Sequence, residues 1–353
     1  MNNTTRMPHF TRRKFLKQSG VASAAILSGC VVGRQGSHSR SNVVQTVLGP
    51  VPAKDLGFTL CHEHVMCDFI GAEQTGRHRW KVDEVVQTIL PHLRQLKLRG
   101  VTGFVDCTPA YIGRDPRVLK ALASETGMHI LTNTGYYGGA GDKFVPKHAY
   151  TETAAQLSDR WVREWEQGIE DTKVRPGFIK TGVDEAQGTP PHLSEIDAKL
   201  IRSSALASRR TGLPVTCHTG GGPAGLAATQ LFIEQGADPE KFIVAHSDGH
   251  GIEFNKRIAS LGAWVSFDAV SRKPVEEHLK LVTAMMEQHS SRLLLSHDNG
   301  WYWVGQAKGG EVRDYNYIAD VFLPALRKSG ASEALITQLT IGNPARAFGL
   351  RSA

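Results

Sequence analysis

The sequence is poor in several features that would assign it to a specialised class of protein. It has five cysteines in 353 residues and no Cys-x-x-Cys spacing, which argues against a disulfide framework and a closed structural zinc site. Its 41% hydrophobic and 21% charged residues exclude disordered and collagen-like chains, and a polytopic membrane protein is also excluded. The composition predicts a globular protein with a sizeable core.

The cysteines beyond residue 30 lie in or beside strand-like runs, and we expect them in the core: Cys61, Cys67, Cys107 and Cys217. A disulfide between Cys61 and Cys107 is the alternative.

The chain also lacks acidic residues at its start, where its basic excess is concentrated. The formal net charge is +7, but residues 1–29 hold five Lys and Arg and no acid, so the remainder carries only +2. Nucleic-acid binding therefore loses its main support. Arg12-Arg13-Lys14-Phe15-Leu16-Lys17 matches the twin-arginine export pattern, and a short, weakly apolar stretch follows it.

Cys30 follows Leu27-Ser28-Gly29, a lipobox-like sequence. We therefore predict a twin-arginine signal peptide over 1–29, a lipidated Cys30 with a flexible tether over 30–45, and a catalytic domain over 46–353. The partners would be the twin-arginine translocase and a membrane reached through the lipid anchor, with the domain on the periplasmic or cell-surface side. An uncleaved basic tail with a chance cysteine is the alternative.

Eight short apolar runs alternate with amphipathic stretches from residue 56 onward, which predicts a (β/α)8 barrel of the TIM type. The runs span 58–65, 103–108, 129–137, 177–183, 214–219, 242–247, 263–270 and 292–298. No Gly-x-Gly-x-x-Gly follows the first run, so a dinucleotide-binding fold is disfavoured. Residues 332–350 are expected to form one more helix that closes the barrel floor.

The carboxyl ends of these runs are rich in metal-ligand residue types, and in such barrels those ends meet at one mouth. The set consists of His62, His64, Lys180, His218, His246 and Asp298. The period of two in a strand places both histidines of His62-Glu63-His64 on the inward face and Glu63 on the other. A lone histidine is more often a core residue, but a whole desolvated set without partners would cost several kcal/mol. Imidazole and carboxylate ligands favour Zn, Co, Mn or Fe.

This ordered set resembles the phosphotriesterase family of the amidohydrolase superfamily. The resemblance spans about 46–349 and includes Gly113-Arg114-Asp115, Gly177-Phe178-Ile179-Lys180, His246-Ser247-Asp248 and Asn343-Pro344-Ala345-Arg346. It implies two divalent metal ions, Zn first among them. His62, His64 and Asp298 would hold the buried ion and His218 and His246 the exposed one. Lys180, carboxylated by carbon dioxide, would bridge both. It also implies a homodimer. A salt-bridged Lys180 beside a single metal is the alternative.

The implied chemistry is metal-assisted hydrolysis of an ester-type bond. The site would keep about one positive charge, because the carbamate, Asp298 and a bridging hydroxide offset most of the charge of two divalent ions. This charge would stabilise a developing oxyanion. The bridging hydroxide would attack the substrate, with Asp298 accepting its proton.

Substrate choice rests on fewer residues. Tyr137 matches a tyrosine of the lactonase-like members and favours a lactone or carboxylic ester, with a phosphotriester as the alternative. Asp268 matches the family. At the next position phosphotriesterases tend to have His and lactonases Arg, so Ala269 matches neither branch. Trp301 and Tyr302, in an aromatic loop after the eighth run, are expected to contact substrate. A non-catalytic ligand-binding surface lipoprotein and a cyclic-amide hydrolase also stay open.

Overall fold

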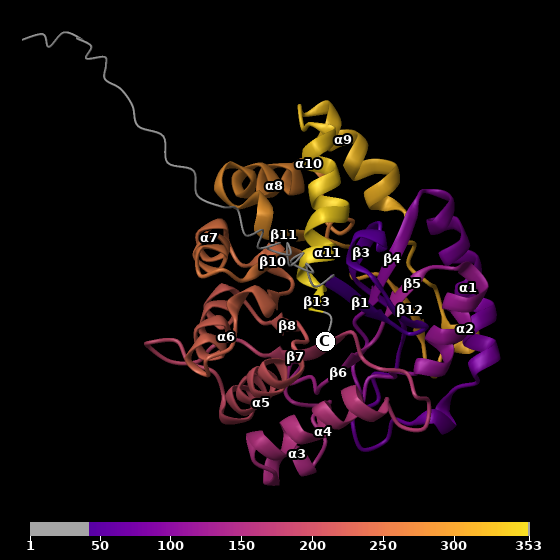
Figure 1. The fold of residues 1–353 in the computed structure, drawn as a ribbon, viewed down its shortest axis with the longest axis vertical. Helices are drawn as coiled ribbons and strands as arrows, with labels where there is room; N and C mark the ends of the chain where they lie inside the picture. The colour runs from indigo at the N-terminus through magenta and orange to yellow at the C-terminus, as the bar shows by residue number, and fades with distance from the viewer. Residues whose placement is uncertain (1–41, 352–353) are drawn as a thin grey trace, which may run out of the picture. The chain divides into compact units, whose positions relative to one another are not determined.

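The (β/α)8 barrel expected from the eight apolar runs is present in the computed structural model, which describes residues 42–351 (Figure 1). The predicted signal peptide, the lipidation site Cys30 and most of the predicted tether lie outside these residues. Within 42–351, no helix combines the length and hydropathy that crossing a bilayer requires.

Parallel strands form the barrel wall in chain order. The strands are β3 (Phe58–Cys67), β4 (Val101–Asp106), β5 (His129–Leu131) with its continuation β6 (Asn133–Thr134), β7 (Phe178–Val183), β8 (Val215–Thr219), β9 (Phe242–Val244), β10 (Trp264–Phe267) and β11 (Leu293–Leu295). Each pairs in parallel with the next along the chain through two ladders, β3-β4-β5 and β6-β7-β8-β9-β10-β11. Every predicted run therefore overlaps a strand, although β3 extends past the end of its run and β4 begins before the start of its run.

The residues just after β11 close the barrel against β3. The backbone N–H of Asp298 donates to the carbonyl of His62 at 3.0 Å, and the N–H of His64 donates to the carbonyl of Asn299 at 2.9 Å. The short strand β12 (Gly300–Trp303) then continues this pairing in parallel with β3. These hydrogen bonds form the seam of the barrel, the place where the first and last strands meet. The seam thus joins the two segments that carry His62, His64 and Asp298.

Helices surround the strands, as Figure 1 shows. They are α1 (Val82–Leu98), α2 (Pro116–Thr126), α3 (His148–Thr151), α4 (Ala154–Gln167), α5 (Glu195–Thr211), α6 (Gly222–Glu234), α7 (Ile252–Ser260), α8 (Val275–His289), α9 (Leu323–Lys328), α10 (Glu333–Thr337) and α11 (Asn343–Ala347). Local sequence sets their ends: Asp115 caps α2 ahead of Pro116, and Gly127 ends it in the left-handed conformation.

Two hydrophobic clusters fill the space around the strands. The larger lies between strands and helices and includes Val85 and Ile89 of α1 and Leu200 of α5. The second takes side chains from seven barrel strands, which requires that all seven face a common interior. Its members there are Cys61, Val105, Leu131, Phe178, Ile243, Trp264 and Leu294. The four described cysteines are buried and free, so the alternative disulfide between Cys61 and Cys107 is absent.

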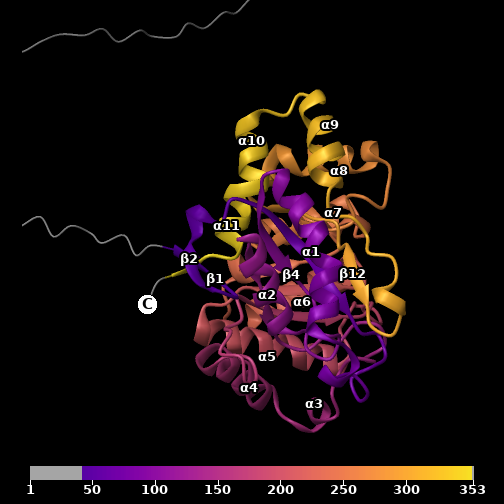
Figure 2. The same ribbon diagram turned by 90° about the vertical axis from the view of Figure 1, so that its right-hand side faces the viewer.

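The predicted boundary between tether and catalytic domain is wrong. Residues 42–46 form β1 (Asn42–Thr46), which pairs antiparallel with β2 (Gly49–Pro52) and with β13 (Leu350–Arg351). Val44 of β1 is fully buried in the second cluster, so the folded domain begins before residue 46. The predicted C-terminal helix likewise ends at Ala347, because the chain then joins this small sheet. Figure 2 shows β1, β2 and α11 on one side and β12 on the opposite side.

Candidate metal centre

All six predicted ligand residues line one pocket of about 460 Å³ at the carboxyl ends of the strands. They are His62, His64, Lys180, His218, His246 and Asp298. They come from β3, β7, β8 and the segments just after β9 and β11. The fold therefore brings together the residues that the sequence places nearly 240 positions apart.

Three of the six form a compact group of the kind that holds a metal ion. Ligand atoms of His62, His64 and Asp298 lie within 4.8 Å of one another, and all three residues are buried. His64 Nε2 lies 3.0 Å from Asp298 Oδ1, and His62 Nε2 lies 4.0 Å from the same oxygen. This is the group that the resemblance assigns to the buried ion.

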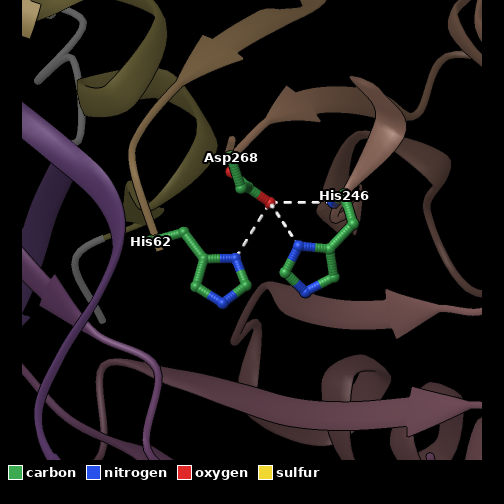
Figure 3. A group of neighbouring side chains, drawn as sticks. All are labelled: His62, His246 and Asp268. Carbon is green, nitrogen blue, oxygen red and sulfur yellow. Dashed lines mark hydrogen bonds and ion pairs between the residues drawn. The ribbon is translucent and has the colours of Figure 1, made fainter. Parts of the chain in front are cut away.

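Hydrogen bonds to their other ring nitrogens orient both imidazoles of β3. His62 Nδ1 lies 2.9 Å from Asp268 Oδ2, so it donates to this carboxylate (Figure 3) and Nε2 is left as an acceptor. His64 Nδ1 lies 2.9 Å from Thr108 Oγ1, whose own hydrogen is donated to the carbonyl of Met66. The Nε2 of His62 is thus in the tautomer that binds a metal. His64 Nε2 faces Asp298 Oδ1, and although burial opposes it, Cys67 and Asp298 raise the pKa of His64 to about 10, so a metal ion would replace the proton on this nitrogen.

Asp268, directly after β10, has a role that the sequence analysis did not assign. Its Oδ2 accepts from His62 Nδ1 and from the backbone N–H of His246, both at 2.9 Å, and its Oδ1 accepts from Ser266. Figure 3 shows the carboxylate between the two imidazoles. His62, His246 and Asp268 also satisfy the geometry of a metal-holding group. Because its hydrogen bonds are already committed, we interpret Asp268 as a residue that orients His62 and His246.

The second pair of imidazoles lies beside the first group. The rings of His218 and His246 are 4.5 Å apart, and the rings of His246 and His62 are 4.8 Å apart. Burial lowers the pKa of His62 and His218 well below the usual value, and it lowers the pKa of His246 to about 4. Neutral imidazoles, the form that binds a metal, are therefore present at neutral pH.

Lys180 is the member of the set that most needs a chemical partner. Its side chain is 1% exposed, and among the described residues no carboxylate lies within ion-pair distance of its Nζ. Its Nζ lies 3.4 Å from His62 Nε2, a hydrogen-bond contact with a neutral ring. A buried ammonium without a counter-ion is costly, whereas a carbamate shared by two cations is not. The donor set thus fits a pair of divalent ions bridged at this position.

Two residues of the set adopt the left-handed backbone conformation that side chains rarely take. His246 has a φ of 59° and Asp298 a φ of 54°. Such conformations cost about 1 to 3 kcal/mol and persist where the surroundings fix them. Both residues lie shortly after the ends of β9 and β11, where the chain turns and the side chain faces the pocket.

Glu63, between the two histidines of β3, faces away from the mouth and is fully buried. Its Oε1 accepts from Ser296 Oγ, from the backbone N–H of His297 and from His297 Nδ1, and its Oε2 accepts from the N–H of Asn299. His297 donates through Nδ1, because its Nε2 accepts from the N–H of Ile318. One carboxylate thus holds the chain on both sides of Asp298.

Two of the three predicted substrate contacts reach the pocket. Tyr137 and Trp301 line it, with the Tyr137 ring 5.0 Å from the His218 ring. Burial raises the pKa of Tyr137, so its hydroxyl keeps its proton. The prediction for Tyr302 is wrong. Its side chain lies outside the pocket lining, and its hydroxyl donates to Glu84 of α1 at 2.6 Å. Since residues 300–303 form β12, neighbouring side chains point to opposite faces.

Comparisons with known proteins agree with this geometry. Residues 42–348 match the model of the Phosphotriesterase family. The chain is 30% identical over 298 residues to the phosphotriesterase homology protein of Escherichia coli, covering 83% of this chain and 98% of that protein. It is 26% identical to the phospho-furanose lactonase of Mycoplasmopsis synoviae, covering 86% and 90%. It is also similar to the structure of an organophosphorus hydrolase from Deinococcus radiodurans, with a TM-score of 0.78, 28% identity, and coverage of 88% and 98%.

Proposed function

The chain belongs to the phosphotriesterase family, and from this membership and the pocket we propose that it is a binuclear metal-dependent hydrolase of lactones or carboxylic esters. The single observation that carries the proposal is the convergence of six ligand-type side chains, from far-apart strands, on one pocket. An open mouth beside such a set is typical of a catalytic rather than a structural metal site.

We assign His62, His64 and Asp298 to one ion, His218 and His246 to the other, and Lys180, as a carbamate, to both. When bound, two such divalent ions lower the pKa of a shared water and polarise a carbonyl or phosphoryl oxygen. We take Zn as the first candidate, with Co, Mn and Fe as alternatives.

The residues of the chain supply the remaining functions. Asp298 accepts the proton of the attacking water. Burial raises the pKa of Asp298, but the hydrogen bond from His64 and the neighbouring imidazoles lower it further than burial raises it, so the carboxylate is ionised and free to take up a proton. Tyr137 keeps its proton and lies beside His218, where its hydroxyl is placed to donate to a substrate oxygen. Asp268 and Thr108 hold the imidazoles of His62 and His64 in place.

Three features support a lactone or carboxylic ester over a phosphotriester. Tyr137 occupies the position expected of lactonase-like members, and the pocket has an apolar cluster around Phe69, Ile112 and Trp301 that suits an acyl chain. One of the relatives reported above is named a lactonase. The similarity to an organophosphorus hydrolase keeps phosphotriesters in the test.

A substrate panel tests this proposal. Aliphatic lactones, aryl carboxylic esters and aryl phosphotriesters are assayed with one preparation whose metal content is measured. We expect about two metal ions per chain and the highest kcat/KM for a lactone or ester. A higher kcat/KM for the phosphotriesters would show that phosphotriesters, and not lactones or carboxylic esters, are the preferred substrate class. One tightly held ion per active chain would refute the binuclear assignment. No hydrolysis despite two bound ions would favour the ligand-binding alternative.

We further propose that the enzyme is exported by the twin-arginine translocase and anchored through a lipid on Cys30, on the periplasmic or cell-surface side, as a homodimer. The basis for the export and the anchor is the Arg12-Arg13 pattern and the sequence before Cys30. The basis for the homodimer is the resemblance to the family. Labelling of expressing bacteria with radioactive palmitate should mark the wild-type chain and leave a Cys30→Ser variant unlabelled. Equal labelling of both chains would refute the anchor. Light scattering of the purified domain tests the dimer.

A further inference from the structure

We propose that the substrate is an ester or lactone that carries a carboxylate, and that Arg272 and Lys273 bind this group. The inference rests on the proposed function, because it concerns the same pocket. It is carried by the charges of the pocket wall. Apart from the six ligand residues, the charged side chains that line the pocket are Arg272, Lys273 and Asp248.

Arg272 is held at the mouth by the segment after β11. Its Nη2 donates to the backbone carbonyl of Asp298 and to Asp298 Oδ2, the latter at 2.8 Å. Its guanidinium carbon lies 5.9 Å from the centre of the Trp301 ring, a cation–π distance. Among the described residues, its Nε and Nη1 have no hydrogen-bond partner. The guanidinium is thus fixed in position with donors left for a ligand.

Lys273 adds a second cation to the same part of the wall. It is exposed, and no carboxylate of the described residues forms an ion pair with it. Among the described residues Asp248 forms no ion pair with Arg272 or Lys273; its carboxylate accepts instead from His278 Nε2 at 2.7 Å and from the N–H groups of Asp268 and Ala269. The cations of the wall therefore have no acid of their own beyond Asp298, which we assign to a metal.

The size and charge of this pair fit a carboxylate. One guanidinium and one ammonium supply donors in number for the two oxygens of a carboxylate, and a guanidinium matches its planar geometry. The rest of the non-ligand lining includes Phe69, Ile112 and Tyr137, which suit the chain that links the carboxylate to the ester. Charge-assisted hydrogen bonds of this kind favour a charged substrate by roughly 10- to 100-fold over an uncharged one.

The experiment compares two esters with the same leaving group and the same number of acyl carbons. Para-nitrophenyl hexanoate is neutral, and para-nitrophenyl hydrogen adipate ends in a carboxylate. The kcat/KM ratio, adipate over hexanoate, is measured for the metal-loaded wild type and for Arg272→Met, Arg272→Lys, Lys273→Gln and Lys273→Glu. Lys280→Gln, on the exposed side of α8 and outside the pocket lining, removes the same charge as a matched control.

We expect a wild-type ratio of about 10 or more that falls as ionic strength rises. The ratio should fall about tenfold in Arg272→Met and in Lys273→Gln, fall further in Lys273→Glu, remain largely intact in Arg272→Lys and be unchanged in Lys280→Gln. A wild-type ratio near one, or one that the Arg272 and Lys273 substitutions do not alter, overturns the inference while hexanoate hydrolysis still supports the proposed function. Hydrolysis of neither ester by protein with two bound metals overturns the inference, and the proposed function is overturned with it only if the aliphatic lactones of the substrate panel are not hydrolysed either.

Discussion

The substitution Glu63→Gln tests how the barrel seam supports the metal centre. Glu63 is fully buried and accepts four hydrogen bonds from the segment Ser296, His297 and Asn299. Glutamine keeps an acceptor in place of Oε1, but its amide group replaces Oε2 and faces the N–H of Asn299, which is also a donor.

The expected loss of folding stability follows from these four hydrogen bonds. An orphaned buried N–H costs about 1 to 3 kcal/mol, and bonds to a neutral rather than a charged acceptor lose about 1 kcal/mol each. We expect a total of about 4 to 6 kcal/mol from the orphaned N–H and the three weakened bonds, which corresponds to a fall in Tm of about 5 to 10 °C in a domain of this size. Since Asp298 lies between two of the donors, metal affinity should also fall, by about 10- to 100-fold.

Differential scanning calorimetry and metal titration measure the two effects. Glu253→Gln is the control, because its side chain in α7 is 82% exposed and the same charge is removed without a buried network. A Tm within about 1 °C of the wild type, with unchanged metal affinity, would refute the account of the seam.

The other predictions concern the centre itself. Asp298→Asn should retain metal but lower kcat by about two orders of magnitude or more, and unchanged turnover would exclude Asp298 as the proton acceptor. Asp268→Asn should lower metal affinity about 10- to 100-fold, as seen by competition with a chelator, because His62 loses the carboxylate that orients it; wild-type affinity would contradict this role. Tyr302→Phe should leave KM unchanged and cost about 1 kcal/mol of stability, and a large rise in KM would restore Tyr302 to the substrate site. Burial lowers the pKa of His246 to about 4, below its unfolded value of about 6.5. Metal-free protein should therefore lose stability as the pH falls from about 6.5 towards 4, by up to about 1.4 kcal/mol per pH unit for this group. Urea denaturation across this range measures the slope, and a stability that does not change with pH would be inconsistent with a buried neutral imidazole.

The eight strands and the six pocket residues were predictable because both follow from local patterns. An apolar run followed by a histidine or an aspartate can be read from a few neighbouring residues, and parallel barrel strands necessarily end at one mouth. The two glycines that end α2 and α5, Gly127 and Gly212, are likewise local signals.

The errors arose where the structure depends on distant partners. Residues 42–46 form a strand because Leu350 and Arg351 pair with Asn42 and Val43, a contact across the whole domain that no local pattern contains. Tyr302 was expected beside Trp301 because the segment was interpreted as a loop. Once it is a strand, its period of two separates the two side chains. The alternation of side chains between the two faces of a strand was the signal in the sequence that would have separated Tyr302 from Trp301.

Asp268 was visible as a family position, but its role depends on the direction of one carboxylate oxygen. Its distance to His62 Nδ1 is a property of β3 and β10 together, 206 residues apart. Arg272 likewise gains significance only because the segment after β11 comes within reach of its guanidinium. Residue type alone identifies neither.

Closure of the barrel through Asp298 and Asn299 would make the metal site a sensor of any unfolding that begins between the first and last strands. If the ring opens between its first and last strands, the hydrogen bonds that join His62 to Asp298 and His64 to Asn299 break together, and the ligands of the buried ion separate. Release of that ion, followed with a chromogenic chelator, should therefore precede the loss of helical circular dichroism on heating. An excess of metal should raise the temperature of both events.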